Sequence, residues 1–490
     1  MRFGGMRVPV GAGWRICPGE NGVRDMKIGA SRAGIAIAAT VACIMGMAAA
    51  GAQAENLAEE VEALVEDHPQ IQAARRALDA SHQNIRREKS GFLPQASITA
   101  GAGYEHTDSL ATRALGLENQ QFFATNATVE VRQNLFSGFS RFAGTASAKA
   151  LKRASENTLA AVRQNVILEG VTAYLNVLRN RELVRLNAGN ERAIREQLEL
   201  EDERVTRGSG ISVDVLLAKS RLQIAKEQSI AFEGALKDSI STYIQVFGHP
   251  PTLESMVPMQ VPPSMLPESK EAAAEKLQAE NPVIKIASAQ ADSAMHEIDR
   301  AQSTYYPSVD VVGSANIENN FAGVEDVRHD YAVKLELTWQ LFDGFLTPAN
   351  SAEANARYKE AIQSGRDVSR KTTELMELSW HEMEVAKERA ELLRNAMNIA
   401  GEVFQSRIEL REAGKETAIN VLDAENELFS ACINFVNAFF DSQVAAFRVL
   451  NTLGRLDTRA VAQSTPVDNS AVVAQCGFTP SEGGGYQPAQ

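Results

Sequence analysis

The chain has 490 residues, of which 23% are charged and 44% are hydrophobic, and its formal net charge is −13. This length predicts more than one compact core. The ordinary hydrophobic content excludes a polytopic helical membrane protein, and without a basic cluster nucleic acid is not an expected partner.

The first 54 residues have the pattern of an export signal. Lys27 and Arg32 form a charged segment that precedes the apolar stretch AGIAIAATVACIMGMAAAG, and Ala52-Gln53-Ala54 is a small-x-small cleavage site. We therefore expect cleavage after Ala54, with an uncleaved membrane anchor as the alternative. Loss of six basic and two acidic residues would leave an acidic exported chain with a net charge of about −17.

The rest of the chain repeats itself. With an offset of 213 residues, EDHPQIQAARRALDASHQNI (66–85) parallels AENPVIKIASAQADSAMHEI (279–298) and GFLPQASITAGAGY (91–104) parallels TYYPSVDVVGSANI (304–317). With an offset of 206, NLFSGFS (134–140) parallels QLFDGFL (340–346) and GSGISVDVLLAKSRL (208–222) parallels GKETAINVLDAENEL (414–428). We expect the loop RALGLENQ (113–120) to hold the seven extra residues of the first copy.

These pairs predict two copies of one unit made of a helix, two strands, a long helix and a shorter helix. The first repeat spans 55–248 and the second 268–456. The Pro-rich segment 249–267 is interpreted as a linker. Residues 457–490, which end in PSEGGGYQPAQ, are interpreted as a disordered periplasmic tail.

Four segments alternate between apolar and polar residues, which is typical of strands with two unlike faces. They are 95–105, 126–135, 308–318 and 330–341. The last is the clearest, with Tyr331, Val333, Leu335, Leu337, Trp339 and Leu341 on one face. Each is roughly ten residues long, which is what a tilted strand needs to cross a bilayer.

The other long segments are predicted to be helical. Each copy contains a proline-free stretch of roughly 65 residues, which would span about 100 Å as one helix. Leu378, Val385, Leu392 and Ile399 recur every seven residues in the second copy, while Glu382 and Arg389 interrupt the partner row Leu375, Ala396, Val403 and Leu410. So thin a seam suits a helix with neighbours on two sides better than a two-stranded coiled coil.

Four strands cannot close a membrane barrel. Unpaired backbone groups in lipid cost several kcal/mol each, and the smallest membrane barrels have about eight strands. We therefore expect a barrel shared among subunits. The alternative is a soluble four-stranded sheet covered by helices, which the export signal and the very long helices disfavour.

The duplication and two turn motifs, VTRGSGISVDVLLAKSRL (205–222) and REAGKETAINVLDAENEL (411–428), resemble the TolC family of outer-membrane efflux ducts over residues 55–455. The resemblance implies a membrane β-barrel continued by a long α-helical barrel. It also implies a trimer in which three chains share a 12-stranded barrel in the outer membrane, with the helices in the periplasm.

The resemblance assigns NLFSGFS and QLFDGFL to the junctions between barrel and tunnel. Phe136 and Phe342 suit the bilayer interface, and Gly138 and Gly344 permit a sharp change of direction. Packing of these phenylalanines, together with Phe139 and Phe345, in a protein core is the alternative.

The resemblance assigns the two hairpin turns to the periplasmic end. Gly208, Ser209, Gly414 and Lys415 are expected at the tip that receives a periplasmic adaptor protein. Asp214, Asn420, Asp423 and Glu416 are expected at the gate. A ring of carboxylates there would favour cations. Asp214 could instead cap the helix that follows it.

Two of these positions depart from the best-known family pattern. Asn420 stands where that pattern has Asp, and Glu416 stands where it has Arg. The salt bridges that close the gate in that pattern therefore cannot form identically here.

No catalytic motif is present, so we expect no enzyme, no cofactor and no metal site. HEMEV (381–385) lacks the second His of a zinc protease, and no Gly-x-Ser-x-Gly elbow occurs. In the mature chain Cys432 and Cys476 would remain, and no essential disulfide framework is expected.

The leading hypothesis is an outer-membrane exit duct for type I protein secretion, working with a periplasmic adaptor and an inner-membrane ABC exporter. A small-molecule efflux duct of a proton-driven pump is the first alternative. A periplasmic coiled-coil scaffold without a pore is the second. The cargo of a wide polar tunnel is not encoded in any motif.

Overall fold

The computed structural model describes residues 57–467 except 115, 117, 209 and 324. The predicted signal region 1–54 therefore lies outside the described residues. The first repeat contains α1 (Leu57–Asp67), α2 (Pro69–Ser90), β1 (Gln95–Thr107), α3 (Leu110–Ala114), β2 (Gln120–Ser137), α4 (Ser140–Thr206) and α5 (Ser212–Phe247). The second contains α6 (Lys270–Glu280), α7 (Pro282–Gln302), η2 (Ser303–Tyr305), β4 (Ser308–Asn319), β5 (Val327–Thr338), α8 (Leu346–Glu412) and α9 (Ala418–Leu453).

The lengths of the helices follow the duplication. Both long helices, α4 and α8, have 67 residues, and both shorter partners, α5 and α9, have 36. The helix predicted before the strands is two helices in each copy. The break falls before Pro69 and Pro282, where His68 and Asn281 accept hydrogen bonds from the next turn as N-caps.

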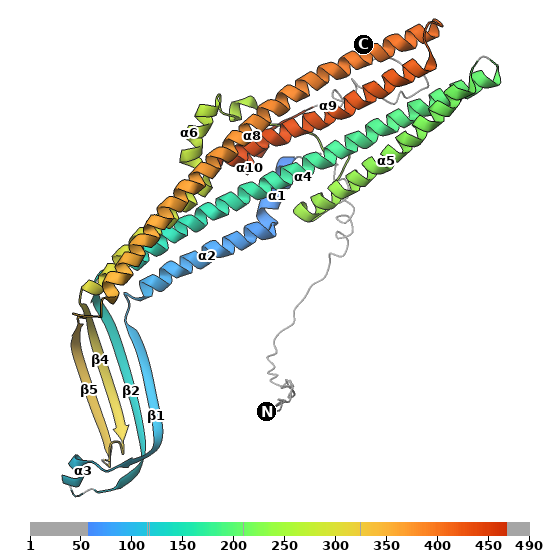
Figure 1. The fold of residues 1–490 in the computed structure, drawn as a ribbon. Helices are drawn as coiled ribbons and strands as arrows, with labels where there is room; N and C mark the ends of the chain where they lie inside the picture. The colour runs from blue at the N-terminus through green and yellow to red at the C-terminus, as the bar shows by residue number, and fades with distance from the viewer. Residues whose placement is uncertain (1–56, 115, 117, 209, 324, 468–490) are drawn as a thin grey trace, which may run out of the picture. The chain divides into compact units, whose positions relative to one another are not determined.

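The four predicted strands form one antiparallel sheet in the order β1-β2-β4-β5 (Figure 1). Gln95 of β1 pairs with Arg132 of β2. The equivalent residues of the second copy, Ser308 of β4 and Thr338 of β5, pair in the same way, so both strand pairs have the same register. The first pair is separated by 37 residues and the second by 30, which places the seven extra residues between β1 and β2, as predicted.

One end of the sheet differs from prediction. β5 ends at Thr338 and not at residue 341, because its partner β4 begins at Ser308, directly after Pro307. Beyond Thr338 the backbone has no neighbouring strand to pair with. The indole Nε1 of Trp339 instead donates to the carbonyl of Tyr305 at 3.2 Å.

The two faces of the sheet are unlike each other. The alternating apolar side chains stand largely exposed, with Tyr331 77%, Val333 81% and Leu335 69% accessible. The opposite face is polar and connected by hydrogen bonds. There Arg132 lies 3.4 Å from Glu336, and the Thr128 hydroxyl donates to Asn316 at 2.8 Å. An exposed apolar face of this size is typical of a surface that meets lipid or another chain.

The main hydrophobic core lies among the helices. Tyr174 of α4, Tyr243 of α5 and Phe435, Phe440 and Phe447 of α9 are all fully buried. The linker 249–267 contains β3 (Met259–Gln260) and η1 (Pro263–Met265), and its Met256, Met259 and Val261 belong to the same core. Because burial of apolar side chains stabilises their position, this linker is a packed part of the fold.

The expectation of disorder from residue 457 is wrong for the part that the structure describes. Residues after α9 form α10 (Thr458–Ala462) and β6 (Thr465–Pro466). Leu456 and Val461 are fully buried, and β6 pairs with β3. Apolar burial therefore orders residues 457–467, while the rest of the predicted tail, 468–490, lies outside the described residues. Cys432 of α9 is buried and disulfide-bonded.

Each strand-to-helix junction makes a sharp turn at a Gly-Phe pair. Gly138 and Phe139 have φ angles of 60° and 69°, and Gly344 and Phe345 have 65° and 67°. A Cβ at Gly138 would also lie 2.2 Å from the carbonyl oxygen of Ser303, whereas nothing lies within 4 Å of one at Gly344. Glycine is therefore needed at both junctions for its backbone conformation and at the first for space as well.

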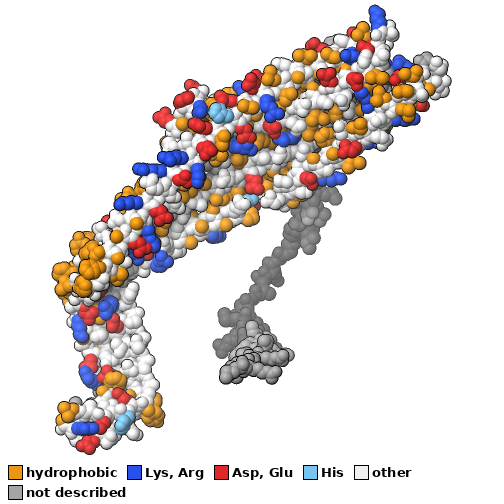
Figure 2. All heavy atoms as spheres, in the orientation of Figure 1, with side chains coloured by type: hydrophobic (Ala, Val, Ile, Leu, Met, Phe, Trp, Pro, Cys, Tyr) orange, Lys and Arg blue, Asp and Glu red, His pale blue; other side chains and the backbone are white. Residues whose placement is uncertain are grey.

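The junction phenylalanines lie mostly at the surface. Phe139, Phe342 and Phe345 are 56%, 71% and 72% exposed, and Phe136 is half-buried. Rings meet edge to face, with centroids 5.2 Å apart for Phe136 and Phe139 and 5.6 Å for Phe342 and Phe345. Figure 2 shows hydrophobic side chains gathered where the sheet meets the helices. Packing inside the core of one chain is therefore not their main role.

Candidate functional site

The tips of the two helical hairpins, α4–α5 and α8–α9, carry the predicted functional residues. Each turn contains one exposed glycine in the left-handed region, Gly208 with φ 75° and Gly414 with φ 72°. A Cβ at either would meet nothing within 4 Å, so backbone conformation alone explains the glycine. Lys415 is exposed beside Gly414, and Ser209 lies outside the described residues.

Glu416 and Asn420 contact each other within the second hairpin. The Asn420 side-chain amide and the Thr417 backbone N–H both donate to Glu416 Oε1, the latter at 3.0 Å. Arg407 lies 3.4 Å from the other carboxylate oxygen. The hydrogen bond from Asn420, followed by that from Thr417, holds the pKa of Glu416 below its usual value. The N-cap of α9 is Thr417, whose hydroxyl accepts from the Asn420 backbone N–H, and the charged carboxylate of Glu416 lies beside this helix start.

Asp214 does not cap α5. The helix begins at Ser212 with Ile211 as its N-cap residue, and Asp214 lies in the first turn. From there its charge acts on the guanidinium of Arg411 in the other hairpin and favours the charged form. Of the two interpretations of Asp214, a helix cap is thus wrong. Its role at a gate stays a prediction.

The first contact between the hairpins is a buried ion pair. Arg411 of α8 donates to the Glu201 carboxylate of α4, and the two side chains are 10% and 3% exposed. Arg204 lies 3.4 Å from the same carboxylate. Burial lowers the pKa of Arg411 most strongly, and the charge of Glu201 opposes that shift. Arginine remains charged even so.

The second contact is nearer the surface. Arg221 of α5 donates to the Leu422 carbonyl and to the carboxylate of Asp423 in α9. The Asp423 side chain is 60% exposed and that of Arg221 is 21% exposed. The first hairpin thus holds the second through one buried and one exposed arginine–carboxylate contact.

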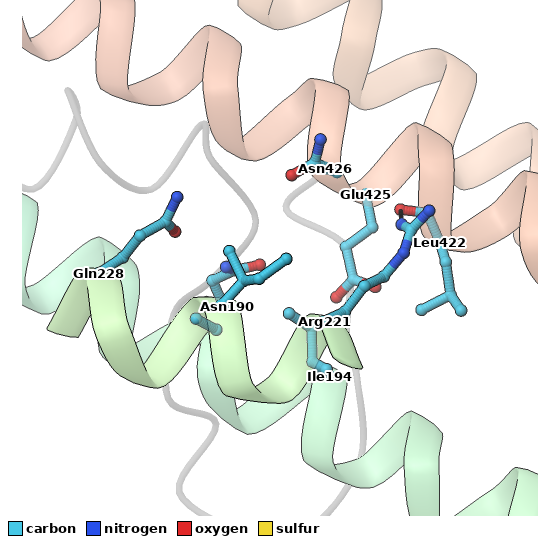
Figure 3. A pocket seen from close by; sticks show the side chains of 9 residues that line it. Asn190, Ile194, Arg221, Gln228, Leu422, Glu425 and Asn426 are labelled. Atoms are coloured by element: carbon cyan, nitrogen blue, oxygen red, sulfur yellow. Dashed lines mark hydrogen bonds between the residues drawn. The ribbon is translucent and has the colours of Figure 1, made fainter. Parts of the chain in front are cut away.

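Beside these contacts the hairpins enclose a cavity of about 200 Å³ (Figure 3). Asn190 and Ile194 of α4, Arg221 and Gln228 of α5, and Leu422, Glu425 and Asn426 of α9 are among the residues that line it. Glu425 is only 5% exposed. Burial raises the pKa of Glu425 to about 7, against the opposing charge of Arg221 and with the support of Glu196.

No motif in the sequence predicted four residues of this site, which are Glu201, Arg221, Arg411 and Glu425. A usable signal was present in the duplication, because Arg411 and Glu425 stand where the first copy has Val205 and Lys219. Charges that occur in only one copy of a repeat can pair across the copies. Among the described residues, no group of three potential metal ligands is close enough to hold an ion. Nor is any described helix long and apolar enough to cross a membrane.

Comparison with known proteins gives consistent matches over most of the chain. The sequence model of the family "Outer membrane efflux protein" matches residues 61–249 and 273–455. Curated relatives include the outer membrane efflux protein BepC of Brucella suis (23% identical; 83% of this chain and 86% of the relative) and the outer membrane protein TolC of Vibrio cholerae (24%; 86% and 95%). The alkaline protease secretion protein AprF of Pseudomonas aeruginosa is 22% identical over 80% of this chain and 83% of its own length.

The fold is shared with solved structures. The outer membrane protein VceC of Vibrio cholerae superposes with a TM-score of 0.69 at 16% identity, covering 81% of this chain and 96% of that one. A likeness at this identity concerns the fold alone, which agrees with the predicted combination of a strand region and long helices.

Proposed function

Because this chain belongs to the outer membrane efflux protein family, and is therefore an outer-membrane channel protein and not an enzyme, we propose that three copies assemble into one continuous duct. Its strands cross the outer membrane and its helices continue as a tunnel through the periplasm. The observation that carries this proposal is the four-stranded sheet, which has an exposed apolar face, a polar face and two unpaired edges.

The unpaired edges support closure into a ring. β1 and β5 are the outer strands of the sheet, and in lipid their free backbone groups would cost several kcal/mol each. Pairing β1 of one copy with β5 of the next satisfies both edges with a single repeated contact. Three copies then give twelve strands, above the minimum of about eight for membrane barrels.

The helices, like the strands of the sheet, form a row that is open at both ends. α5 packs on α4, α4 on α9, and α9 on α8, so α5 and α8 lie at the two ends of a row (Figure 1). Both carry exposed apolar side chains. On α8 these are the predicted heptad row Leu378, Val385, Leu392 and Ile399, each more than half exposed, and on α5 they include Leu216, Ile224 and Ile230. Contact between these rows of adjacent copies would bury both and close the tunnel.

The hairpin tips serve as the periplasmic gate in this proposal. Asp214, Asn420, Asp423 and Glu416 form the acidic and polar surface there, and Gly208, Ser209, Gly414 and Lys415 form the tip that receives an adaptor. The contacts Arg411–Glu201 and Arg221–Asp423 hold the two hairpins of one copy together. Opening requires them to lengthen or exchange partners.

For the cargo we propose protein secretion of type I, through a periplasmic adaptor and an inner-membrane ABC exporter. The relative named as an alkaline protease secretion protein supports this choice. The relative named as an efflux protein supports the second candidate, a small-molecule duct coupled to a proton-driven pump.

Two measurements test the proposal. Ion conductance of the purified protein in planar bilayers separates a duct from a pore-free scaffold, which would give none. A photo-crosslinker placed at Ser209 or Lys415 in living cells, followed by mass spectrometry, identifies the partners at the tip. An adaptor trapped with an ABC exporter supports protein secretion. One trapped with a proton-driven pump supports small-molecule efflux, and capture of neither would overturn the assignment of the tip.

A further inference from the structure

The cavity between the hairpins contains a carboxylate with no hydrogen-bond donor among the described residues. Glu425 projects from α9 into this space and is 5% exposed (Figure 3). Arg221 is the one cationic side chain among the described residues that line the cavity, and its guanidinium is bonded to Leu422 and Asp423. Two carboxylates of α9, those of Asp423 and Glu425, thus interact with the charge of Arg221, but only Asp423 accepts a hydrogen bond from it.

We propose that Glu425 is a proton-responsive switch that couples the acidity of the periplasm to the contact between the two hairpins. When Glu425 is neutral, Arg221 stays on Asp423 and the hairpins remain joined. When Glu425 loses its proton, it becomes a buried charge without a hydrogen-bonded partner, which is costly. The hairpins then part, and water enters the cavity to solvate the carboxylate.

The charges that face Glu425 come from all three helices around the cavity. Arg221 on α5 favours the ionised form, and Glu196 on α4 disfavours it. Asp423 on α9 competes for Arg221. Burial outweighs the effect of Arg221 and moves the titration of Glu425 to about pH 7, within the range of ordinary environmental change. The amides of Asn190, Gln228 and Asn426 line the same cavity and offer hydrogen bonds to entering water.

The direction of the response follows from these contacts. As the pH rises through about 7, the Arg221–Asp423 contact weakens and the hairpins separate more often. The regulatory consequence rests on the proposed function, because only in a duct with a gate at the tips does separation increase conductance. The separation itself does not depend on that function.

The direct test measures the distance between the hairpins in the full-length assembled protein. Spin labels at Ser220 of α5 and Ser430 of α9, both exposed, report it by pulsed electron paramagnetic resonance. In the otherwise unaltered protein we expect the distance distribution to broaden and lengthen between about pH 6 and about pH 8. Glu425→Gln should keep the acidic distribution throughout. Glu427→Gln, an exposed residue of the same helix, should behave like the parent.

A second variant keeps the test decisive if Glu425→Gln does not fold. Gln228→Lys adds a cation to the cavity wall and should move the transition to lower pH, because it favours ionised Glu425. Distances that do not change with pH in the parent, or an unchanged midpoint in Gln228→Lys, would overturn the switch. Conductance of the same variants is recorded separately. Its absence in every variant would overturn the duct, while the distances would still decide the switch.

Discussion

The guanidinium of Arg411 in α8 is bonded to the carboxylate of Glu201 in α4, and this buried ion pair joins the two hairpins near their tips. It joins the two copies of the repeat at positions that are not equivalent under the duplication. Residue 205, the counterpart of Arg411, is a valine, so the contact can form only once in each chain.

Removal of Arg411 should weaken the tip. Arg411→Ala leaves the buried Glu201 carboxylate only its weaker contacts with Arg204 and Gln197. The loss should therefore be smaller than the about 3–5 kcal/mol that is typical when a buried charge keeps no partner. We expect a lower unfolding temperature of the hairpins and, in planar bilayers, a larger and less stable conductance. Arg389→Ala changes an exposed arginine of the same helix and should alter neither. Equal effects of both variants would contradict a specific role for the ion pair.

Loss of the exposed contact between Arg221 and Asp423 should alter gating while leaving stability nearly unchanged. Asp423→Asn removes the negative charge that pairs with Arg221, and an exposed ion pair contributes only about 0–1 kcal/mol. We therefore expect little change in the unfolding temperature but a clear increase in open time. The exchange Arg221→Asp with Asp423→Arg should restore the closed state only in part, because Asp cannot donate to the Leu422 carbonyl. Complete restoration would show that the carbonyl bond is unimportant.

The free energy of unfolding should depend on the protonation of Glu425. The pKa of Glu425 is about 7 in the folded chain, against a model value of 4.5, so folding favours the protonated form. Its contribution is fully present below about pH 4.5 and is lost as the pH rises through about 7. The loss is on the order of 3 kcal/mol per chain. Chemical denaturation at a series of pH values should show this loss in the parent and not in Glu425→Gln. Parallel curves would contradict it.

The two junction glycines should respond differently to alanine. Both need a left-handed backbone, for which an L-residue pays roughly 1–2 kcal/mol. Gly138→Ala should cost more than Gly344→Ala, because its Cβ would also collide with the Ser303 carbonyl. Gly234→Ala, inside α5 with open space around it, should stabilise by up to about 1 kcal/mol. Denaturant titrations of the three variants give the order directly.

A charged side chain on the apolar face of β5 should destabilise the protein in the membrane. Val333→Lys places an ammonium near the middle of a 12-residue strand, where a barrel in lipid typically loses about 2–4 kcal/mol. Ala332→Lys lies one residue away on the other face and should be tolerated. The amount of folded protein in purified outer membranes distinguishes the two. Equal tolerance of both would mean that Val333 does not face lipid.

Much of the fold could be predicted from local pattern. Alternation located all four strands, because a sheet with unlike faces must alternate, and the absence of proline located the two 67-residue helices. The end of β5 was predicted three residues too late because it depends on where its neighbour begins. The ordering of residues 457–467 depends on burial against a core built from distant segments.

The site was harder to predict for the same reason. The turn glycines Gly208 and Gly414 follow from a local motif. The partners of Arg221 and Arg411, however, are set by which turns of separate helices face each other, and that information is tertiary. The heptad row beginning at Leu378 was predicted to be a seam, and this stays a prediction because the row is exposed within one chain. In our account a second copy of the chain covers this row.

The central claim, that neighbouring copies share one barrel, is tested most directly by disulfide cross-linking between the edges of the sheet. Double variants carry one cysteine on β1, at Ser97 or Thr99, and one on β5, at Lys334 or Glu336, all outside the apolar face. In the outer membrane the account predicts that oxidation gives covalent dimers and trimers and nothing larger, and only when β1 and β5 cysteines are both present. Monomers alone, or ladders that continue past three chains, would contradict it.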